Sequence, residues 1–117
     1  MKMKFGIKYN QRDIVLVPFP FSNLSETRKR PVLVLSKDKD NKNSDDLIIC
    51  AITSNLKNKN NAVLIENENL SEGSLPVKSS VKVNKLFCVD KSVVLKKFAK
   101  LNKQTFDKIR KEFYSLI

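Results

Sequence analysis

Two polar groups lie at the ends of two apolar runs and could act together on a phosphate. Arg28, Lys29 and Arg30 directly precede Pro31, and Thr53 ends the apolar run at residues 47–53. A guanidinium group offers a planar fork of donors to two phosphate oxygens, and a hydroxyl adds a neutral donor. The chain contains no histidine, which excludes a histidine-pair or serine–histidine hydrolase and a histidine metal site.

The proline predicts where the cationic group stands. A residue before proline is pushed into extended geometry, and proline itself suits the first position of a strand. Residues 32–35 are all aliphatic, which is typical of a strand covered on both faces. We therefore expect Arg30 where a loop becomes rigid framework. The simpler alternative is a solvated loop arginine beside an ordinary strand.

Strand pairing predicts which group faces Arg30. The runs at residues 31–36 and 47–53 are joined by an entirely polar segment, 37–46, which we expect to be an exposed connection. Sequential strands usually pair. A hairpin centred between Asn41 and Lys42 makes paired positions sum to 83, so Arg30 faces Thr53. Directly opposed residues have Cβ atoms roughly 5 Å apart.

The remaining pattern indicates a small, mainly β protein of the α+β class, a bent barrel with one C-terminal helix packed on it. Residues 66–74 read as an acidic loop in which Gly73 makes a turn, and Asn102 is the expected helix N-cap. We expect strands at residues 13–19, 31–36, 47–53, 62–65, 79–89 and 96–101. An apolar helical stripe follows, formed by Phe106, Ile109, Phe113, Leu116 and Ile117.

Length and composition bound the rest. The chain has 117 residues, and we expect residues 1–117 to form one domain. It lacks an apolar run long enough for a membrane span or a signal core, so we expect a cytoplasmic protein. Cys50 and Cys88 lie in apolar strands without disulfide or zinc spacing, and both read as buried free thiols.

The charge pattern favours a polyanionic partner. The formal net charge is +11, and residues 78–117 hold eleven Lys and Arg against three Asp and Glu. A basic surface concentrates polyanions, which favours nucleic acid. A lysine-rich shell that keeps the chain in solution is the alternative.

Further residues could contact a nucleic acid. Phe19 and Phe21 lie before Arg28 and could stack on unpaired bases, although packing in the core is the commoner use of such residues. Lys85 interrupts an apolar face formed by Val81, Val83, Phe87 and Val89. Either it reaches a cleft, or a bulge turns it outward. The candidate RNA-binding set is Phe19, Phe21, Ser22, Arg28, Lys29, Ser54, Asn55, Lys82, Asn84 and Lys85.

The motifs resemble those of one protein family. Residues 13–21, 29–36 and 50–54, together with the fifth-strand block at 82–87, are similar in order and type to the PemK/MazF toxins of type II toxin–antitoxin systems. The resemblance covers nearly the whole chain. It implies an SH3-like barrel with a C-terminal helix, usually a homodimer, and a cognate antitoxin as partner.

The resemblance also implies an activity. Members are metal-independent endoribonucleases without cofactors that cleave single-stranded RNA, often mRNA, within a short sequence. The 2′-hydroxyl attacks, leaving a 2′,3′-cyclic phosphate and a 5′-hydroxyl. The family's catalytic arginine and threonine fall on Arg30 and Thr53. A guanidinium stays protonated in proteins, so we assign Arg30 electrostatic stabilisation rather than base catalysis.

The chain departs from the family pattern in two places. The first strand begins with Arg12–Asp13 where many members have Gly-Asp. Where PemK-type members have Arg, Asp, Gln and Arg in the fifth-strand block, this chain has, in order, Lys82, Asn84, Lys85 and Phe87. Two other functions stay open: a gyrase poison like CcdB, whose C-terminal end uses a tryptophan that this chain lacks, and a non-catalytic RNA-binding barrel.

Overall fold

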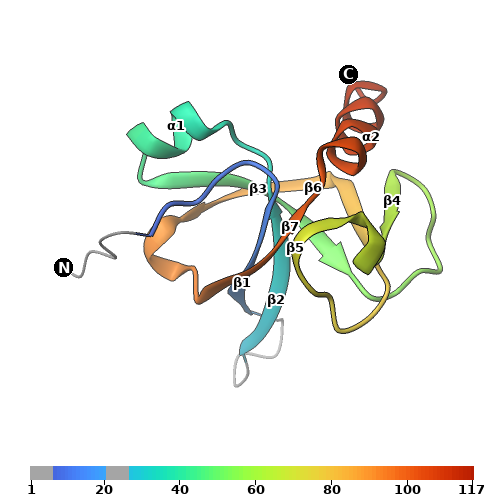
Figure 1. Cartoon of the computed structure of the whole chain (residues 1–117), viewed down its shortest axis with the longest axis horizontal. Coiled ribbons are helices and arrows are strands. Elements are labelled where there is room, and N and C mark those ends of the chain that lie inside the picture. The colour runs from blue at the N-terminus through green and yellow to red at the C-terminus, as the bar shows by residue number, and fades with distance from the viewer. Residues whose placement is uncertain (1–6, 21–26) are drawn as a thin grey trace.

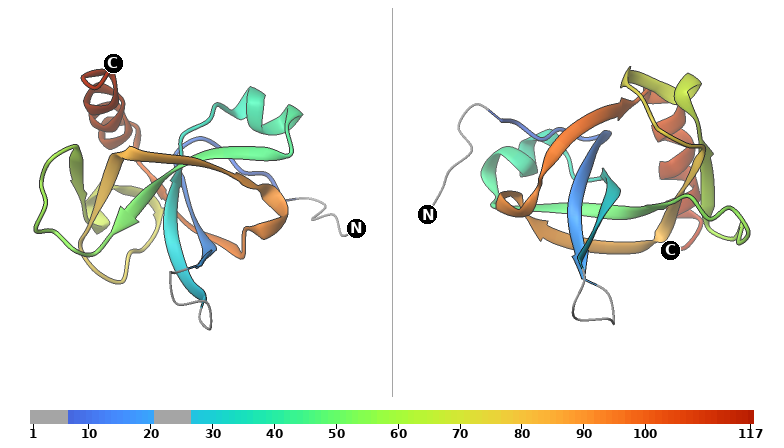
Figure 2. Two further views of the ribbon diagram at one scale, coloured as in Figure 1. Left: turned by 180° about the vertical axis from the view of Figure 1, so that it is seen from behind. Right: turned by 90° about the horizontal axis from the view of Figure 1, so that it is seen from below.

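The fold is a curled seven-stranded antiparallel sheet with a helix over one end (Figures 1 and 2). It is described by a computed structural model, which covers residues 7–20 and 27–117. The strands lie in the order β4-β6-β3-β2-β1-β7-β5. The mainly β, barrel-like fold with a C-terminal helix is confirmed.

The strands follow the apolar runs of the sequence. Their bounds are β1 Asp13–Pro20, β2 Thr27–Val34, β3 Asp46–Thr53, β4 Ala62–Ile65, β5 Leu70–Gly73, β6 Ser79–Asp90 and β7 Lys96–Leu101. The helices are α1 Asp38–Asn43 and α2 Lys103–Tyr114, with 3-10 turns at η1 Asn67–Asn69 and η2 Lys91–Val93. Neither helix of this described part is long and apolar enough to cross a bilayer.

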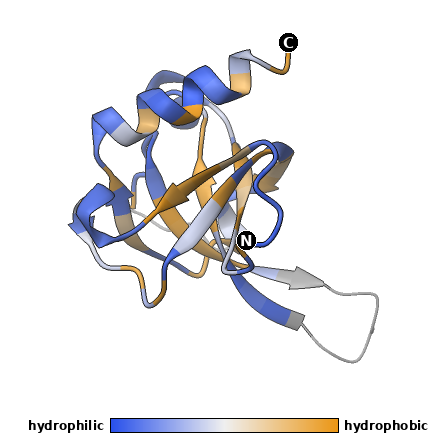
Figure 3. Ribbon diagram, turned by 90° about the vertical axis from the view of Figure 1, so that its right-hand side faces the viewer, coloured by the Kyte–Doolittle hydropathy of each residue, from blue (hydrophilic) through white to orange (hydrophobic). Residues whose placement is uncertain are grey.

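The central strands have a packed core on each face. Leu33 belongs to one buried cluster, and its neighbours Val32 and Val34 belong to the other; all three are fully buried. Hydropathy colouring shows the same concentration of apolar residues in the strands (Figure 3). Because successive side chains point to opposite faces, an all-aliphatic run fits a strand covered on both sides, as expected.

The second strand begins earlier than the proline predicts. β2 starts at Thr27, so Arg30 and Pro31 lie within the strand rather than at its beginning. β1 accounts for the extension, because Pro20 to Leu16 pair with Thr27 to Pro31. Pairing with β3 covers only Val32–Val34. The ladder to β3 therefore stops where proline has no N–H to donate.

Two segments expected to be loops contain regular structure. The polar segment 37–46 includes α1, whose Asn41 is 2% exposed and donates through Nδ2 to the carbonyls of Tyr9 (3.1 Å) and Ser36 (2.9 Å). The acidic segment 66–74 includes η1 and β5, which pairs with β7. Neither segment shows apolar periodicity. Main-chain and amide hydrogen bonds hold these segments in place.

The C-terminal helix matches the expectation over its first turns. Asn102 Oδ1 accepts a hydrogen bond from the Thr105 N–H (2.8 Å), which is the N-cap geometry predicted. Phe106 and Ile109 are buried in the same cluster as Leu33. The predicted stripe is wrong at its end, because Leu116 and Ile117 are exposed and lie beyond the last helical turn.

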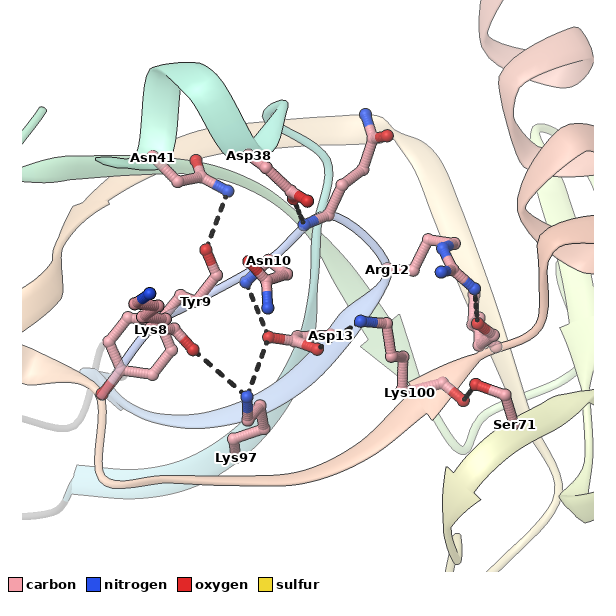
Figure 4. A network of polar contacts seen from close by, with 12 residues as sticks. Lys8, Tyr9, Asn10, Arg12, Asp13, Asp38, Asn41, Ser71, Lys97 and Lys100 are labelled. Atoms are coloured by element: carbon pink, nitrogen blue, oxygen red, sulfur yellow. Dashed lines mark hydrogen bonds and ion pairs between the residues drawn. The ribbon is translucent and has the colours of Figure 1, made fainter. Parts of the chain in front are cut away.

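A buried carboxylate ties the N-terminal lead-in to β7 (Figure 4). Asp13 is 1% exposed and lies 3.5 Å from Lys97 Nζ and 3.8 Å from Lys100 Nζ. Its Oδ2 also accepts from the Asn10 N–H at 2.7 Å. Burial raises the pKa of this carboxyl, and the Asn10 hydrogen bond and the two lysines oppose that shift only in part.

Candidate functional site

The predicted register of the central hairpin is confirmed. Val32 pairs with Ala51, Leu33 with Cys50 and Val34 with Ile49, so each pair sums to 83. Continued by two residues, this register places Arg30 opposite Thr53. Both side chains line one pocket of about 340 Å³, which we call the Arg30 pocket.

The lining of the Arg30 pocket has an apolar part and a polar part. The apolar part consists of Pro31, Val32, Ala51 and Ile52. The polar part consists of Arg30, Thr53, Asn55, Asn58, Lys82 and Lys85. Among these described lining residues, three are cationic and none is acidic. A concave, positively charged wall over an apolar floor suits an anion that carries a flat apolar group.

A second hollow continues from the first. It has a volume of about 380 Å³ and shares Arg30, Pro31 and Ile52 with the Arg30 pocket. Arg28, Lys29, Ser54 and Phe98 are among its other lining residues. We call it the Arg28 hollow. The two cavities thus meet at Arg30, and the cations Arg28 and Lys29 extend the positive surface along β2.

Thr53 is oriented by the backbone two residues further along the chain. Its Oγ1 accepts a hydrogen bond from the Asn55 N–H at 3.1 Å, a local contact typical of a threonine at a strand end. Because an oxygen that accepts this N–H still carries its own hydrogen, the hydroxyl retains a donor for a bound group. The local contact therefore holds Thr53 in place and leaves it able to donate.

A bulge in β6 decides the positions of Lys82 and Lys85. Ala51 of β3 pairs with Lys82, but the adjacent Cys50 pairs with Leu86, so residues 83–85 are extra on β6. The bulge reverses the faces of the strand. Val81 and Val83 pack in one core, whereas Phe87 and Val89 pack against the other, so the single face expected for them is wrong.

The bulge brings Lys85 to the pocket. Lys85 is exposed and lines the Arg30 pocket, so the two predicted outcomes, a bulge and a cleft position, occur together. Lys82, also a candidate RNA-binding residue, lines the pocket from a nearly buried position. It is only 7% exposed, and its Nζ donates to the carbonyls of Asn60 (2.7 Å) and Asn58 (3.4 Å).

The other candidates divide into three groups. Asn84 is exposed in the bulge and lines neither the Arg30 pocket nor the Arg28 hollow. Phe19 lies in β1 and pairs with Arg28 through its backbone. Phe21 and Ser22 lie outside the described residues. Sequence reasoning missed Asn58, which lines the pocket; its only signal was the asparagine-rich composition of residues 54–61.

The prediction of a buried free thiol is confirmed for Cys50 and wrong for Cys88. Cys50 is buried, and burial raises the pKa of its thiol to about 12, so it is a poor nucleophile. Cys88 is exposed, contrary to the sequence interpretation. The reason is again the bulge, after which the even-numbered residues Leu86, Cys88 and Asp90 lie on the exposed face.

Among the residues that the structure describes, no group of three or more acidic, cysteine or histidine side chains could hold a metal ion.

Comparison with solved structures finds the same fold. A MazE–MazF structure from Deinococcus radiodurans superposes with a TM-score of 0.76 at 20% identity, covering 94% of this chain and 96% of that one. An endoribonuclease in complex with its cognate antitoxin, from a Mycobacterial species, gives 0.73 at 13% identity, with 92% of each chain covered. Mycobacterium tuberculosis toxin MazF-mt6 gives 0.70 at 14% identity, covering 89% and 94%.

Comparison of the sequence itself assigns the family. No curated protein sequence matches the chain. A sequence model of the PemK-like, MazF-like toxins of type II toxin–antitoxin systems matches residues 10–117, which include every described residue of both cavities. The chain therefore belongs to the PemK-like, MazF-like toxin family of type II toxin–antitoxin systems.

Proposed function

We propose that this chain is a sequence-specific, metal-independent endoribonuclease, the toxin of a type II toxin–antitoxin pair, and that it cleaves single-stranded RNA. The observation that carries the proposal is the meeting of Arg30 and Thr53 in one cationic pocket formed by β2 and β3. Family membership adds the reaction class. The endoribonuclease named among the structural neighbours is consistent with it.

The chemistry needs no nucleophile from the protein. The ribose 2′-oxygen attacks the adjacent phosphorus, a P–O2′ bond forms, and the P–O5′ bond breaks. The 2′-hydroxyl loses its proton and the leaving 5′-oxygen gains one. The products are a 2′,3′-cyclic phosphate and a 5′-hydroxyl. The protein's task is to stabilise the charge that accumulates on the phosphate oxygens in the transition state.

Arg30 and Thr53 would perform that task. Arg30 offers a fork of N–H donors to two phosphate oxygens, and the Thr53 hydroxyl offers a third donor held by the Asn55 N–H. Donors that are already in place gain most as charge develops, because they need not reorganise during the reaction. We assign both residues as catalytic.

The RNA backbone would follow the two cavities. Arg28 and Lys29 line the Arg28 hollow with Ser54, and Lys82 and Lys85 line the Arg30 pocket. Cations on both sides of Arg30 allow phosphates on both sides of the scissile bond to be neutralised. Binding of this kind releases counterions, so affinity should fall steeply as salt rises.

The partner proposals follow from the family. A MazE–MazF complex and an endoribonuclease with its cognate antitoxin are among the structural neighbours. We propose that a cognate antitoxin covers the cationic cavities, that the toxin acts as a homodimer, and that mRNA in the cytoplasm is its substrate. An acidic segment would complement Arg28, Lys29 and Lys85.

The deciding experiment maps RNA ends. Transcripts are incubated with the purified chain in EDTA, and new 5′ ends are sequenced with and without prior kinase treatment. The proposal expects cleavage at a short recurring sequence, with 5′ ends that ligate only after phosphorylation. Salt-sensitive binding without new ends would indicate a non-catalytic RNA-binding barrel. Trapped gyrase–DNA cleavage complexes in a parallel assay would indicate a gyrase poison.

A further inference from the structure

The segment between β3 and β4 forms one wall of the Arg30 pocket and fixes two amides in a defined orientation. Asn55 Oδ1 accepts from the Lys57 N–H (3.1 Å), and Asn58 Oδ1 accepts from the Asn60 N–H (3.0 Å). A backbone N–H can be met only by the oxygen of an amide, so neither side chain can be flipped without losing its bond. Both residues line the pocket.

Lys82 holds this wall against the sheet. Its ammonium bonds to the Asn60 and Asn58 carbonyls from a nearly buried position. The Val83 N–H donates to the Asn61 carbonyl at 2.9 Å beside it. This mostly polar loop, in which Leu56 is half-buried, is thereby attached to β6 at three carbonyls, which keeps its amides in place.

The wall presents hydrogen-bond donors. Within the described residues, neither Asn55 Nδ2 nor Asn58 Nδ2 donates to the protein, so both NH₂ groups remain for a bound molecule. The ammonium groups of Lys82 and Lys85 carry donors only. Uracil and guanine present a carbonyl on the base-pairing edge where cytosine and adenine present an amino group. A donor wall pairs with the carbonyl and faces the amino group donor to donor.

We propose that the Arg30 pocket takes a keto base, uracil or guanine, of the bound RNA and rejects the amino bases cytosine and adenine. The inference rests on the proposed function in that the occupant is single-stranded RNA. The pocket volume of about 340 Å³ is at the small end of ligand sites, which span roughly 300–1,000 Å³. Pro31, Val32, Ala51 and Ile52 supply the apolar surface for the flat face of the base.

Binding of non-cleavable RNA tests the proposal without requiring cleavage. Fluorescent 2′-fluoro oligonucleotides lack the attacking hydroxyl, and their affinities are measured by anisotropy at fixed salt. Oligo-uridine is compared with oligo-cytidine, and oligo-inosine with oligo-adenosine, so each pair differs mainly in a keto or an amino group. We expect the keto member to bind about tenfold more tightly in both pairs, the effect of one well-placed base contact.

Two substitutions identify the amides as the source. Asn55→Asp and Asn58→Asp each keep the oxygen that accepts the backbone N–H but replace the NH₂ donor with an acceptor. The keto preference should fall below about threefold in the double variant, since one base contact accounts for the tenfold effect. Asn60→Asp adds a negative charge to the same segment outside the pocket lining and should keep the preference.

The outcomes separate this proposal from the proposed function. Equal affinity for the keto and amino members of both pairs, including no binding at all, overturns it. An unchanged preference in the double aspartate variant overturns it as well. If the native chain prefers keto bases yet cleaves no RNA, the nuclease proposal fails and the pocket assignment stands. If the native chain cleaves RNA without any keto preference, the pocket assignment fails and the nuclease proposal stands.

Discussion

Replacing Arg30 should separate catalysis from binding. Arg30 lies where the two cavities meet, and four other cations, Arg28, Lys29, Lys82 and Lys85, line them. These four remain in Arg30→Ala, so we expect KM to rise only a few-fold. Loss of one preorganised donor costs about 10²–10³ in kcat, and Arg30 supplies a charged fork, so kcat should fall about 10³-fold or more. That corresponds to about 4 kcal/mol of transition-state stabilisation.

The assay is multiple-turnover cleavage of a fluorogenic RNA that contains the mapped site, in EDTA, from which kcat and KM are obtained. Lys39→Ala removes the same charge from the exposed face of α1, outside both cavities, and should cleave like the native chain. Arg30→Lys keeps the charge but loses the fork, and should be intermediate. Arg30 is half-buried and pairs with Val17 through its main chain, so it is part of the β1–β2 framework. Circular dichroism therefore checks that each Arg30 variant is folded. A folded Arg30→Ala variant with kcat within tenfold of native would refute the assignment.

Four further predictions concern the framework. In the native state one thiol per chain, Cys88, should react with a thiol reagent, and Cys50 should react only on unfolding. The pKa of Cys50 rises from 9.0 to about 12 on folding, so the thiol of the unfolded state loses its proton first as pH rises. The unfolding free energy measured in urea should therefore fall by about 1 kcal/mol per pH unit above pH 9. A Cys50→Ala variant with the same slope would contradict this. Gly73 has φ +76, and an added Cβ would meet the Phe98 carbonyl oxygen. Gly73→Ala should therefore lower the free energy of unfolding, measured in urea, by about 1–3 kcal/mol. An unchanged unfolding midpoint would contradict this. The folded-state pKa of Asp13 is raised, so its contribution to stability grows as pH falls from that pKa toward 3.8 and is lost as pH rises. Acid unfolding curves of Asp13→Asn should lack this gain. Native and Asp13→Asn stabilities that change in parallel with pH would contradict the prediction.

The central hairpin shows how far local pattern reaches. The aliphatic run of β2 and the apolar run of β3, separated by one polar segment, predict the register that pairs Val32 with Ala51. A shift of one residue would move every side chain to the other face, which restricts the possible pairings. The position of Arg30 opposite Thr53 follows from that register, although the predicted beginning of the strand is wrong.

Polar segments are where the sequence interpretation fails. α1 and β5 lie in stretches without apolar periodicity, and both are held by hydrogen bonds to residues far away in the chain, such as Asn41 to Tyr9. Periodicity reports only which face of an element is buried, so it carries no information on an element that main-chain or amide contacts hold. The extension of β2 has the same origin, because pairing with β1 stabilises its cationic residues as strand.

The sequence by itself determined six of the seven described strands, the C-terminal helix and the hairpin register, from which the proximity of Arg30 and Thr53 is predicted. Only the tertiary structure decided the other side of the pocket. β6 pairs with β4 as far as Lys82, and its pairing with β3 is interrupted between Lys82 and Leu86, so three residues bulge out. The interruption of the apolar face by Lys85 left a bulge as one of two predicted outcomes, but the extent of the bulge depends on two partner strands distant in sequence. The bulge turns Lys82 inward onto the loop carbonyls, places Lys85 at the pocket and exposes Cys88.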